Sequence, residues 1–557
     1  MADQALTPTP EAATEPIAVR LNERRAPWYV LLPGIVVAVA MLVPLGYLAV
    51  RGLEADPAAL AGLVFRARTF TLLVNTVSLT AGVLIVTTAI ALPLAVILER
   101  TTFPARRIVT VLAVFPLAVP GYVMAYSLIS LGGNYGFLAR VFGLSVARPS
   151  GFFGALAALS LYTFPYLFLN LRSALSGLDP GIEESAMSLG YSPREVFFRV
   201  VLPHLRPAFL SGWLVIGLYV LGDFGAVALM RFEVFSYAIF TQYSAAFDRV
   251  YAAWLSIILL SLTGAFVVIE ARVLRNRRFS RLGSGVARRR RLSVMRPVPY
   301  AASGLFVVTV VGFSVGLPVV ILSYWLTIAP PAVRAADLLG AFLRSAGASA
   351  PAALLAALLA VPIAYAGARY PSRLTRTFER AAYLGYAMPP LAFALALVFF
   401  SLRAAPILYQ TLPLLIGAYA LSFLVLALGP IRAALLQAPV RLEEAARSLG
   451  CTAFGAFTRT IVPLLGKGIR SGVILVFVIS MKELPITFLL APAGYTTLAV
   501  NVFSRTSEGM LAEAAPYAAT IVLFSSLFVV LLLHKEGRVD EGKTITRRKN
   551  SSEGHRV

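Results

Sequence analysis

Two polar segments of nearly identical pattern are the part of this sequence best suited to bind a partner. Residues 178–204 and 438–464 align without a gap at an offset of 260. Each holds two adjacent glutamates, then small residues, a glycine and a proline. A carboxylate pair beside small side chains offers a compact acidic surface to a basic partner. The candidate docking residues are Glu183, Glu184, Ser185, Ala186, Gly190 and Pro203 in the first copy and Glu443, Glu444, Ala445, Ala446, Gly450 and Pro463 in the second.

Local signals within the first copy predict two short helices joined by a glycine turn. Asp179 followed by Pro180 is a favourable helix start, with Asp as the cap and Pro at the first helical position. Gly190 suits the left-handed residue that ends many helices. Ser192 and Glu195 have the spacing of a capping box that opens a second helix. The alternative is a pair of ordinary amphipathic loop helices kept similar by duplication.

Three ionisable residues interrupt apolar stretches and are the candidates for a translocation path. Asp223 aligns with Glu483 at the same offset of 260, and Lys482 precedes Glu483. Ionisable groups inside a membrane are costly and usually line a pore or pair with one another. Two carboxylates at matched depth would give a cation hard oxygen donors, so Asp223 and Glu483 are also candidate metal ligands. Alternatively, Lys482 pairs with one carboxylate and braces helices broken near Gly225 and Pro485.

The sequence lacks the residue clusters of an enzyme. No phosphate-binding loop pattern, zinc-ligand spacing or nucleophile motif is present. The histidines are His204, His534 and His555, which are scattered, whereas a membrane enzyme would need a His/Asp/Cys cluster near one face. A single cysteine, Cys451, excludes an internal disulfide. We therefore expect no catalytic site and no cofactor bound by this chain.

The composition indicates which elements must position these residues. The 557 residues are 59% hydrophobic and 13% charged, whereas soluble domains carry roughly a quarter of charged residues. The apolar residues form runs of about 20, the length of a membrane-spanning helix. The sequence thus predicts an all-α polytopic membrane protein. The expected spans are 27–50, 72–98, 106–131, 151–172, 207–230, 253–274, 298–327, 347–367, 380–402, 406–428, 468–490 and 513–534.

The basic residues predict the orientation of these twelve helices. The net charge of +23 would be compatible with nucleic-acid binding, but the arginines and lysines gather in alternate loops. Ten arginines, for example, lie between Arg272 and Arg296. This is the positive-inside pattern, which places both termini and both duplicated loops in the cytoplasm beside the lipid surface. No nucleic-acid partner is expected.

The two halves of the chain repeat beyond the loops. Residues 91–95 match 360–364, and Pro120 matches Pro389, both at an offset of 269. The loop between the third and fourth spans must then be nine residues shorter in the second half (269 minus 260). Six spans per half give both halves the same orientation, so they form a parallel repeat. The predicted divisions are a cytoplasmic tail 1–26, a first six-helix half 27–274, a basic cytoplasmic linker 275–297, a second six-helix half 298–534 and a cytoplasmic tail 535–557.

Both loops resemble the EAA signature of the integral-membrane permease subunits of bacterial ABC importers. In that pattern Glu-Ala-Ala is followed at fixed spacing by a glycine and a Leu-Pro pair. The pattern also has an isoleucine two residues before the Leu-Pro pair. Ser185, at the first alanine position, and Thr460, at the isoleucine position, depart from it. The matching residues are Glu184-Ser185-Ala186, Gly190 and Leu202-Pro203 in the first copy, and Glu444-Ala445-Ala446, Gly450 and Val462-Pro463 in the second.

The resemblance implies a type I ABC importer permease fold in the bacterial cytoplasmic (inner) membrane. It implies that each loop inserts into a cleft of a cytoplasmic ABC ATPase homodimer, which binds ATP and Mg outside this chain. An extracytoplasmic substrate-binding protein would deliver the substrate, and the two halves would work by alternating access. A secondary transporter with twelve helices would not need paired docking loops.

The substrate expected from the resemblance is ferric iron. Fused two-half permeases of this kind resemble ferric-iron importer permeases, with thiamine importer permeases next. The segments that carry the iron-type resemblance are 221–227 and 481–487. Thiamine, polyamine, phosphonate and sulfate remain as alternatives.

Overall fold

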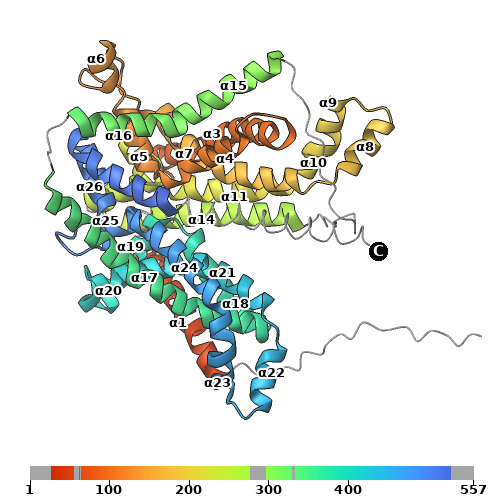
Figure 1. Cartoon of the computed structure of the whole chain (residues 1–557). Coiled ribbons are helices and arrows are strands. Elements are labelled where there is room, and N and C mark those ends of the chain that lie inside the picture. Colours follow the sequence, from red (N-terminus) through yellow and green to blue (C-terminus); the bar gives the residue numbers. More distant parts are fainter. Residues whose placement is uncertain are drawn as a thin grey trace, which may run out of the picture.

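The computed structural model describes residues 27–54, 62, 64–246, 248–275, 297–328 and 333–528. Within these ranges the regular elements are helices (Figure 1). The predicted tails 1–26 and 535–557 and nearly all of the linker 275–297 lie outside the described residues. The halves are therefore compared through their helices alone.

The first half holds six spans, several of them in pieces. Short elements join them: α6 (Phe137–Phe142), α8 (Pro180–Ser188), α9 (Pro193–Val196), η2 (Phe197–Val201), α10 (Leu202–His204) and α13 (Phe235–Ser244). The spanning elements are α1 (Trp28–Leu53), α3 (Ala67–Arg100), α4 (Arg106–Val114) with η1 (Phe115–Ala118) and α5 (Gly121–Ile129), α7 (Gly151–Ser176), α11 (Arg206–Gly222) with α12 (Gly225–Leu229), and α14 (Arg249–Arg275).

The second half repeats this order. Its short elements are η4 (Pro406–Leu408), α22 (Arg441–Ser448), α23 (Ala453–Ala456), η5 (Phe457–Ile461) and α26 (Leu498–Ser507). Its spanning elements are α15 (Pro297–Val311) with η3 (Gly312–Gly316) and α16 (Leu317–Ile328), α17 (Ala335–Arg369), α18 (Arg373–Ala387) with α19 (Pro390–Ala404), α20 (Leu412–Ser422) with α21 (Leu424–Gln437), α24 (Val462–Met481) with α25 (Pro485–Leu490), and a last helix Leu511–Phe528.

Eight helices of the described chain are long and apolar enough to cross a membrane, and four bent pairs bring the number to twelve. The predicted all-α, twelve-span architecture is confirmed. Two spans predicted as continuous, 106–131 and 380–402, are sharply broken: α4–η1 meets α5 at 95°, and α18 meets α19 at 108°. The breaks fall at Pro120 and Pro389, which align in the repeat. Proline has no N–H to continue a helix and disfavours the helical conformation of the residue before it. Val119 and Met388, which precede these prolines, are extended, with ψ of 111° and 138°.

The halves exchange their first helices. Helix α1 packs on α17, α18 and α19 of the second half, while α15 and α16 pack on α3, α4 and α5 of the first half. Figure 1 shows α1 (red) among the helices of the second half and α15 and α16 (green) across those of the first. Tyr47 of α1 meets Phe400 of α19 at a ring separation of 5.6 Å. Each six-helix repeat is therefore completed by a helix of the other.

Close packing within each half relies on small side chains. Helix α3 packs along α7, and α17 packs along both α21 and α24. One face of α17 places Ala348, Ala352, Ala356 and Ala360 one turn apart, and all four are fully buried. In lipid no hydrophobic force drives helices together, so close approach over small residues is what stabilises their association.

Candidate functional site

The first duplicated loop has the predicted form of helix, glycine turn and second helix. Asp179 Oδ1 accepts a hydrogen bond from the Gly181 amide at 2.9 Å, which caps α8. Gly190 follows with φ of +90°. The capping box is present, because the Ser192 amide donates to Glu195 Oε2 at 3.0 Å and the Glu195 amide donates to Ser192 Oγ at 3.4 Å. The sequence signals therefore determined this local structure.

The second loop repeats that form with a different cap. After α22, Gly450 adopts φ of +88°, and Thr452 Oγ1 accepts from the Gly455 amide at 3.0 Å. A Cβ at Gly190 or Gly450 would meet no atom within 4 Å. Glycine is required at both turns by the left-handed backbone and not by a crowded neighbour in this chain. Each loop then continues through a π-helical turn, η2 or η5, directly before Leu202-Pro203 or Val462-Pro463.

The first glutamate of each pair is bound inside the chain. Arg100 Nη1 and Nη2 donate to the two carboxylate oxygens of Glu183 at 3.1 and 2.9 Å. The side chains of Arg100 and Glu183 are only 10% and 5% exposed. In the second half Arg369 Nε donates to Glu443 at 3.0 Å, and the Tyr365 hydroxyl donates to its other oxygen at 2.8 Å. Each loop is thus fixed to the last turn of α3 or α17.

The two glutamates of each pair therefore differ: the first binds an arginine within the chain, and the second is exposed. The sequence did not indicate this difference. Glu183 and Glu443 were predicted as part of the docking surface, but the structure turns them inward. Arg100 and Arg369 belong to the basic residues of alternate loops, from which the sequence analysis predicted only the orientation of the helices. The two arginines stand at equivalent positions of the repeat, and each precedes an equivalent glutamate. This match was the only sequence signal for the two arginine–glutamate ion pairs.

The remaining loop residues separate into an outward and an inward set. Ala186 and Ala446 are buried, whereas Glu184, Ser185, Glu444 and Ala445 are exposed. Pro203 is half-buried and Pro463 is exposed. Sequence reasoning missed Leu189 and Leu449, which precede the turn glycines and are 79% and 86% exposed. Both loops, α8–α9 and α22–α23, project from the bundle at separate places (Figure 1). Each therefore presents an exposed leucine beside an exposed carboxylate.

The predicted path residues lie at two helix breaks. Asp223 follows α11, and its Oδ1 accepts from the amides of Ala226 and Val227 at 2.9 and 3.3 Å. Glu483 follows α24, and its Oε1 accepts from the Ile486 amide at 3.2 Å. Each carboxylate thus accepts hydrogen bonds from amides in the first turn of the short helix that follows it in the chain, α12 or α25. The expected breaks near Gly225 and Pro485 are confirmed.

Lys482 is not joined to either carboxylate. Its Nζ donates to the Leu117 carbonyl at 2.9 Å, and its own carbonyl accepts from the Tyr122 hydroxyl at 3.2 Å. Within the described ranges it forms no ion pair. The expected pairing of Lys482 with a carboxylate is therefore replaced by two hydrogen bonds. They connect the break between α24 and α25 in the second half with the break at Pro120, between η1 and α5, in the first half.

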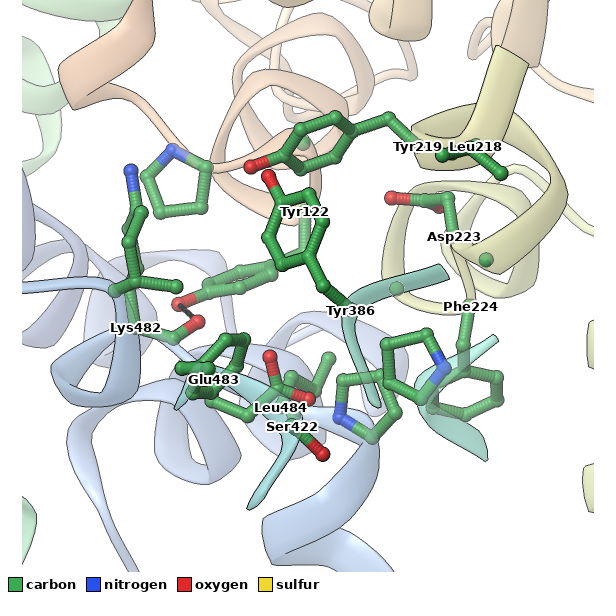
Figure 2. A pocket seen from close by; sticks show the side chains of 18 of the residues that line it. Tyr122, Leu218, Tyr219, Asp223, Phe224, Tyr386, Ser422, Lys482, Glu483 and Leu484 are labelled. Atoms are coloured by element: carbon green, nitrogen blue, oxygen red, sulfur yellow. Dashed lines mark hydrogen bonds between the residues drawn. The ribbon is translucent and has the colours of Figure 1, made fainter. Parts of the chain in front are cut away.

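A cavity of about 150 Å³ lies where these breaks meet. Residues of both halves line it, among them Asp223, Lys482 and Glu483. Figure 2 shows Asp223 and Lys482 on opposite sides of the cavity, with tyrosine side chains between them. The tyrosines, which sequence reasoning did not select as path residues, come from α5, α7, α11 and α18: Tyr122, Tyr162, Tyr166, Tyr219 and Tyr386. Among the residues that the structure describes, no three of His, Cys, Asp and Glu gather as a metal site.

Comparison with known proteins places this architecture among transport proteins. The family model described as "Binding-protein-dependent transport system inner membrane component" matches twice, at residues 91–281 and 352–535. The chain is 33% identical over 512 residues to the Fe(3+)-transport system permease protein FbpB 2 of Haemophilus influenzae, which covers 91% of this chain and 98% of that protein.

Relatives with other named substrates match over shorter stretches. The sulfate transport system permease protein CysT of Salmonella typhimurium is 33% identical over 159 residues, 27% of this chain and 56% of its own. The molybdenum transport system permease protein ModB of Escherichia coli K12 is 32% identical over 134 residues, 23% of this chain and 58% of its own.

Proposed function

Because this chain belongs to the family of binding-protein-dependent transport system inner membrane components, we propose that it is the permease subunit of an ATP-driven importer of ferric iron. The assignment of ferric iron as the substrate rests on the match to an Fe(3+)-transport permease along 91% of the chain. The protein would lie in the bacterial cytoplasmic membrane with both termini in the cytoplasm. It has no catalytic role, and a separate ATPase would bind and hydrolyse ATP with Mg.

The two duplicated loops are the proposed docking sites of an ABC ATPase homodimer. Two equivalent loops in one chain suit a partner with two equivalent clefts. The exposed carboxylates Glu184 and Glu444 would bind basic residues of the ATPase, and the exposed leucines Leu189 and Leu449 would enter its apolar surface. Closing of the ATPase dimer would draw the loops together and move α3 and α17 through the buried ion pairs. The cavity between the halves would then open outward, toward a substrate-binding protein.

Charge reversal tests this docking surface. We expect Glu184→Lys with Glu444→Lys to weaken co-purification of the ATPase more than the two alanine substitutions do, because a lysine would be buried against basic residues. Both sites are exposed within this chain, so its own fold should be retained. Glu508→Lys, an exposed glutamate outside the loops, is the matched control. Equal ATPase recovery with the lysine and alanine variants would contradict the docking role of these carboxylates.

The cavity chemistry supports a cationic substrate over an anionic one. Asp223 and Glu483 contribute two carboxylates against the single ammonium of Lys482. Sulfate, molybdate and phosphonate would meet excess negative charge there. Thiamine and polyamine are cationic, and the relation to the Fe(3+) permease is what favours iron over them.

Reconstitution decides among these substrates. Proteoliposomes would contain this chain, its ATPase and its substrate-binding protein, with labelled ferric iron, thiamine and sulfate supplied in parallel. We expect ATP-dependent accumulation of iron alone. Thiamine or sulfate uptake without iron uptake would overturn the substrate, and iron uptake that needs no ATP would instead indicate a secondary transporter.

A further inference from the structure

The two cavity carboxylates have oxygen atoms that the helix caps do not use. Asp223 binds the α12 amides through Oδ1, and Glu483 binds the α25 amide through Oε1. Asp223 Oδ2 lies beside Gly121, only 3.0 Å from the place that a Cβ of Gly121 would take. One oxygen of each carboxylate is therefore held in position by the short helix, while the other is left for the cavity.

A buried hydroxyl lies beside this carboxylate. The Tyr162 side chain, on α7, lines the cavity, and the residue is 7% exposed. Within the described part of the chain its hydroxyl has no hydrogen-bond partner. Its ring lies 2.8 Å from the same Cβ position of Gly121, so Tyr162 and Asp223 approach each other over a residue that has no side chain. Tyr162 and Asp223 both line the cavity, so the hydroxyl is placed to bind a group there beside the carboxylate.

The size of the cavity fits an ion better than an organic molecule. Its volume of about 150 Å³ has room for several waters, since one water needs roughly 10–15 Å³ of such space. Pockets for drug-sized ligands are larger, on the order of 300–1,000 Å³. A metal ion with part of its hydration shell can occupy this space.

We propose that Asp223, Glu483 and Tyr162 ligate a partly hydrated ferric ion in this cavity during transport. The assignment rests on the proposed function and adds the residues that hold the substrate. Carboxylate and phenolate oxygens are hard donors that suit ferric iron. A hydroxide ligand of the hydrated ion takes the phenol proton and leaves as water while the iron–phenolate bond forms. Three protein oxygens, with water completing the shell, hold the ion loosely enough for release, which passage requires.

Tyr162→Phe tests the assignment, because it removes one oxygen atom and keeps the ring. We expect iron uptake by the complete reconstituted transporter to fall roughly tenfold, while ATP hydrolysis stimulated by the binding protein persists. Tyr126→Phe is the matched control: Tyr126 is a fully buried tyrosine outside the cavity, whose hydroxyl donates to the Leu511 carbonyl at 2.9 Å. Its uptake should stay close to that of the unchanged protein.

A spectroscopic measurement separates ligation from a structural effect. Purified full chain titrated with ferric nitrilotriacetate should develop the visible charge-transfer absorption of iron–phenolate, and so should Tyr126→Phe. Tyr162→Phe should not. Unchanged uptake or absorption in Tyr162→Phe, joint loss of uptake and ATP hydrolysis, or no absorption in the unchanged protein would each overturn the proposed ligation. Failure of the unchanged transporter to accumulate iron would instead overturn the proposed function.

Discussion

Replacing both Arg100 and Arg369 with alanine should abolish transport while ATP hydrolysis continues. Each arginine holds a glutamate of one duplicated loop: Glu183, which is buried, or Glu443, whose side chain is 13% exposed. Removing one partner of a buried ion pair typically costs about 3–5 kcal/mol, because the remaining charge is no longer compensated. The loops should then lose their fixed position on α3 and α17. The ATPase could still bind the exposed surface and turn over, but its movement would not reach the helices. Iron uptake and phosphate release measured in the same proteoliposomes would show this uncoupling.

Three further variants distinguish coupling from general damage. Arg199→Ala removes an exposed loop arginine, 3.7 Å from Glu195, and should change neither activity. Arg100→Glu combined with Glu183→Arg should restore part of the lost uptake, since it rebuilds the pair with opposite polarity. Tyr365→Phe removes one of the hydrogen bonds to Glu443 and should have a milder effect than Arg369→Ala. Full uptake by the double alanine variant would show that the ion pairs do not transmit the movement.

Neutralising the two cavity carboxylates should reduce iron uptake by roughly one to two orders of magnitude, the usual consequence of weakening a metal site. The variant is Asp223→Asn with Glu483→Gln. The amide oxygens can still accept hydrogen bonds from Ala226 and Ile486, so α12 and α25 keep their caps. Charge alone is removed. ATP hydrolysis should survive, because the substitutions leave the residues of both loops unchanged. The measurement is uptake of labelled iron beside ATP hydrolysis stimulated by the binding protein.

A capping aspartate elsewhere provides the matched control for this variant. Asp248 Oδ1 accepts from the Tyr251 amide at 2.9 Å at the start of α14, and Asp248 does not line the cavity. Asp248→Asn should leave uptake unchanged. If the double cavity variant loses ATP hydrolysis together with uptake, the carboxylates act as structural caps of the broken helices. If it transports iron at the normal rate, the ion does not depend on their charge.

Local chemistry explains why the sequence predicted the docking loops so closely. Asp179, Gly190 and the pair of Ser192 with Glu195 act on backbone groups within a few residues of themselves. Such interactions depend little on the rest of the fold. The same holds for the spans, whose length and apolar character are set by the bilayer. Proline positions also carried information: the sequence matched Pro120 with Pro389, and the structure places both at sharp breaks.

Contacts between distant segments were outside the reach of these patterns. The sequence analysis predicted that Glu183 and Glu443 bind a partner protein. In the fold they bind Arg100 and Arg369, which are 83 and 74 residues away in the chain. It suggested that Lys482 pairs with a neighbouring carboxylate, whereas Leu117 accepts from it across 365 residues. Nothing in the spacing of Tyr162, Tyr219 and Tyr386 indicated that they share one cavity, because they lie on three helices.

The sequence by itself determined the class of this protein: a duplicated all-helical membrane chain with two similar polar loops and one polar break in each half. Periodicity, capping and charge placement act locally or through the bilayer, so they can be read along the chain. The tertiary structure alone decided which helices complete which half, which glutamates face inward and which residues line the cavity. Those outcomes depend on how α1 and α15 cross between the halves and on how the broken helices meet. Packing of helices fixes these relations only when the whole chain is assembled.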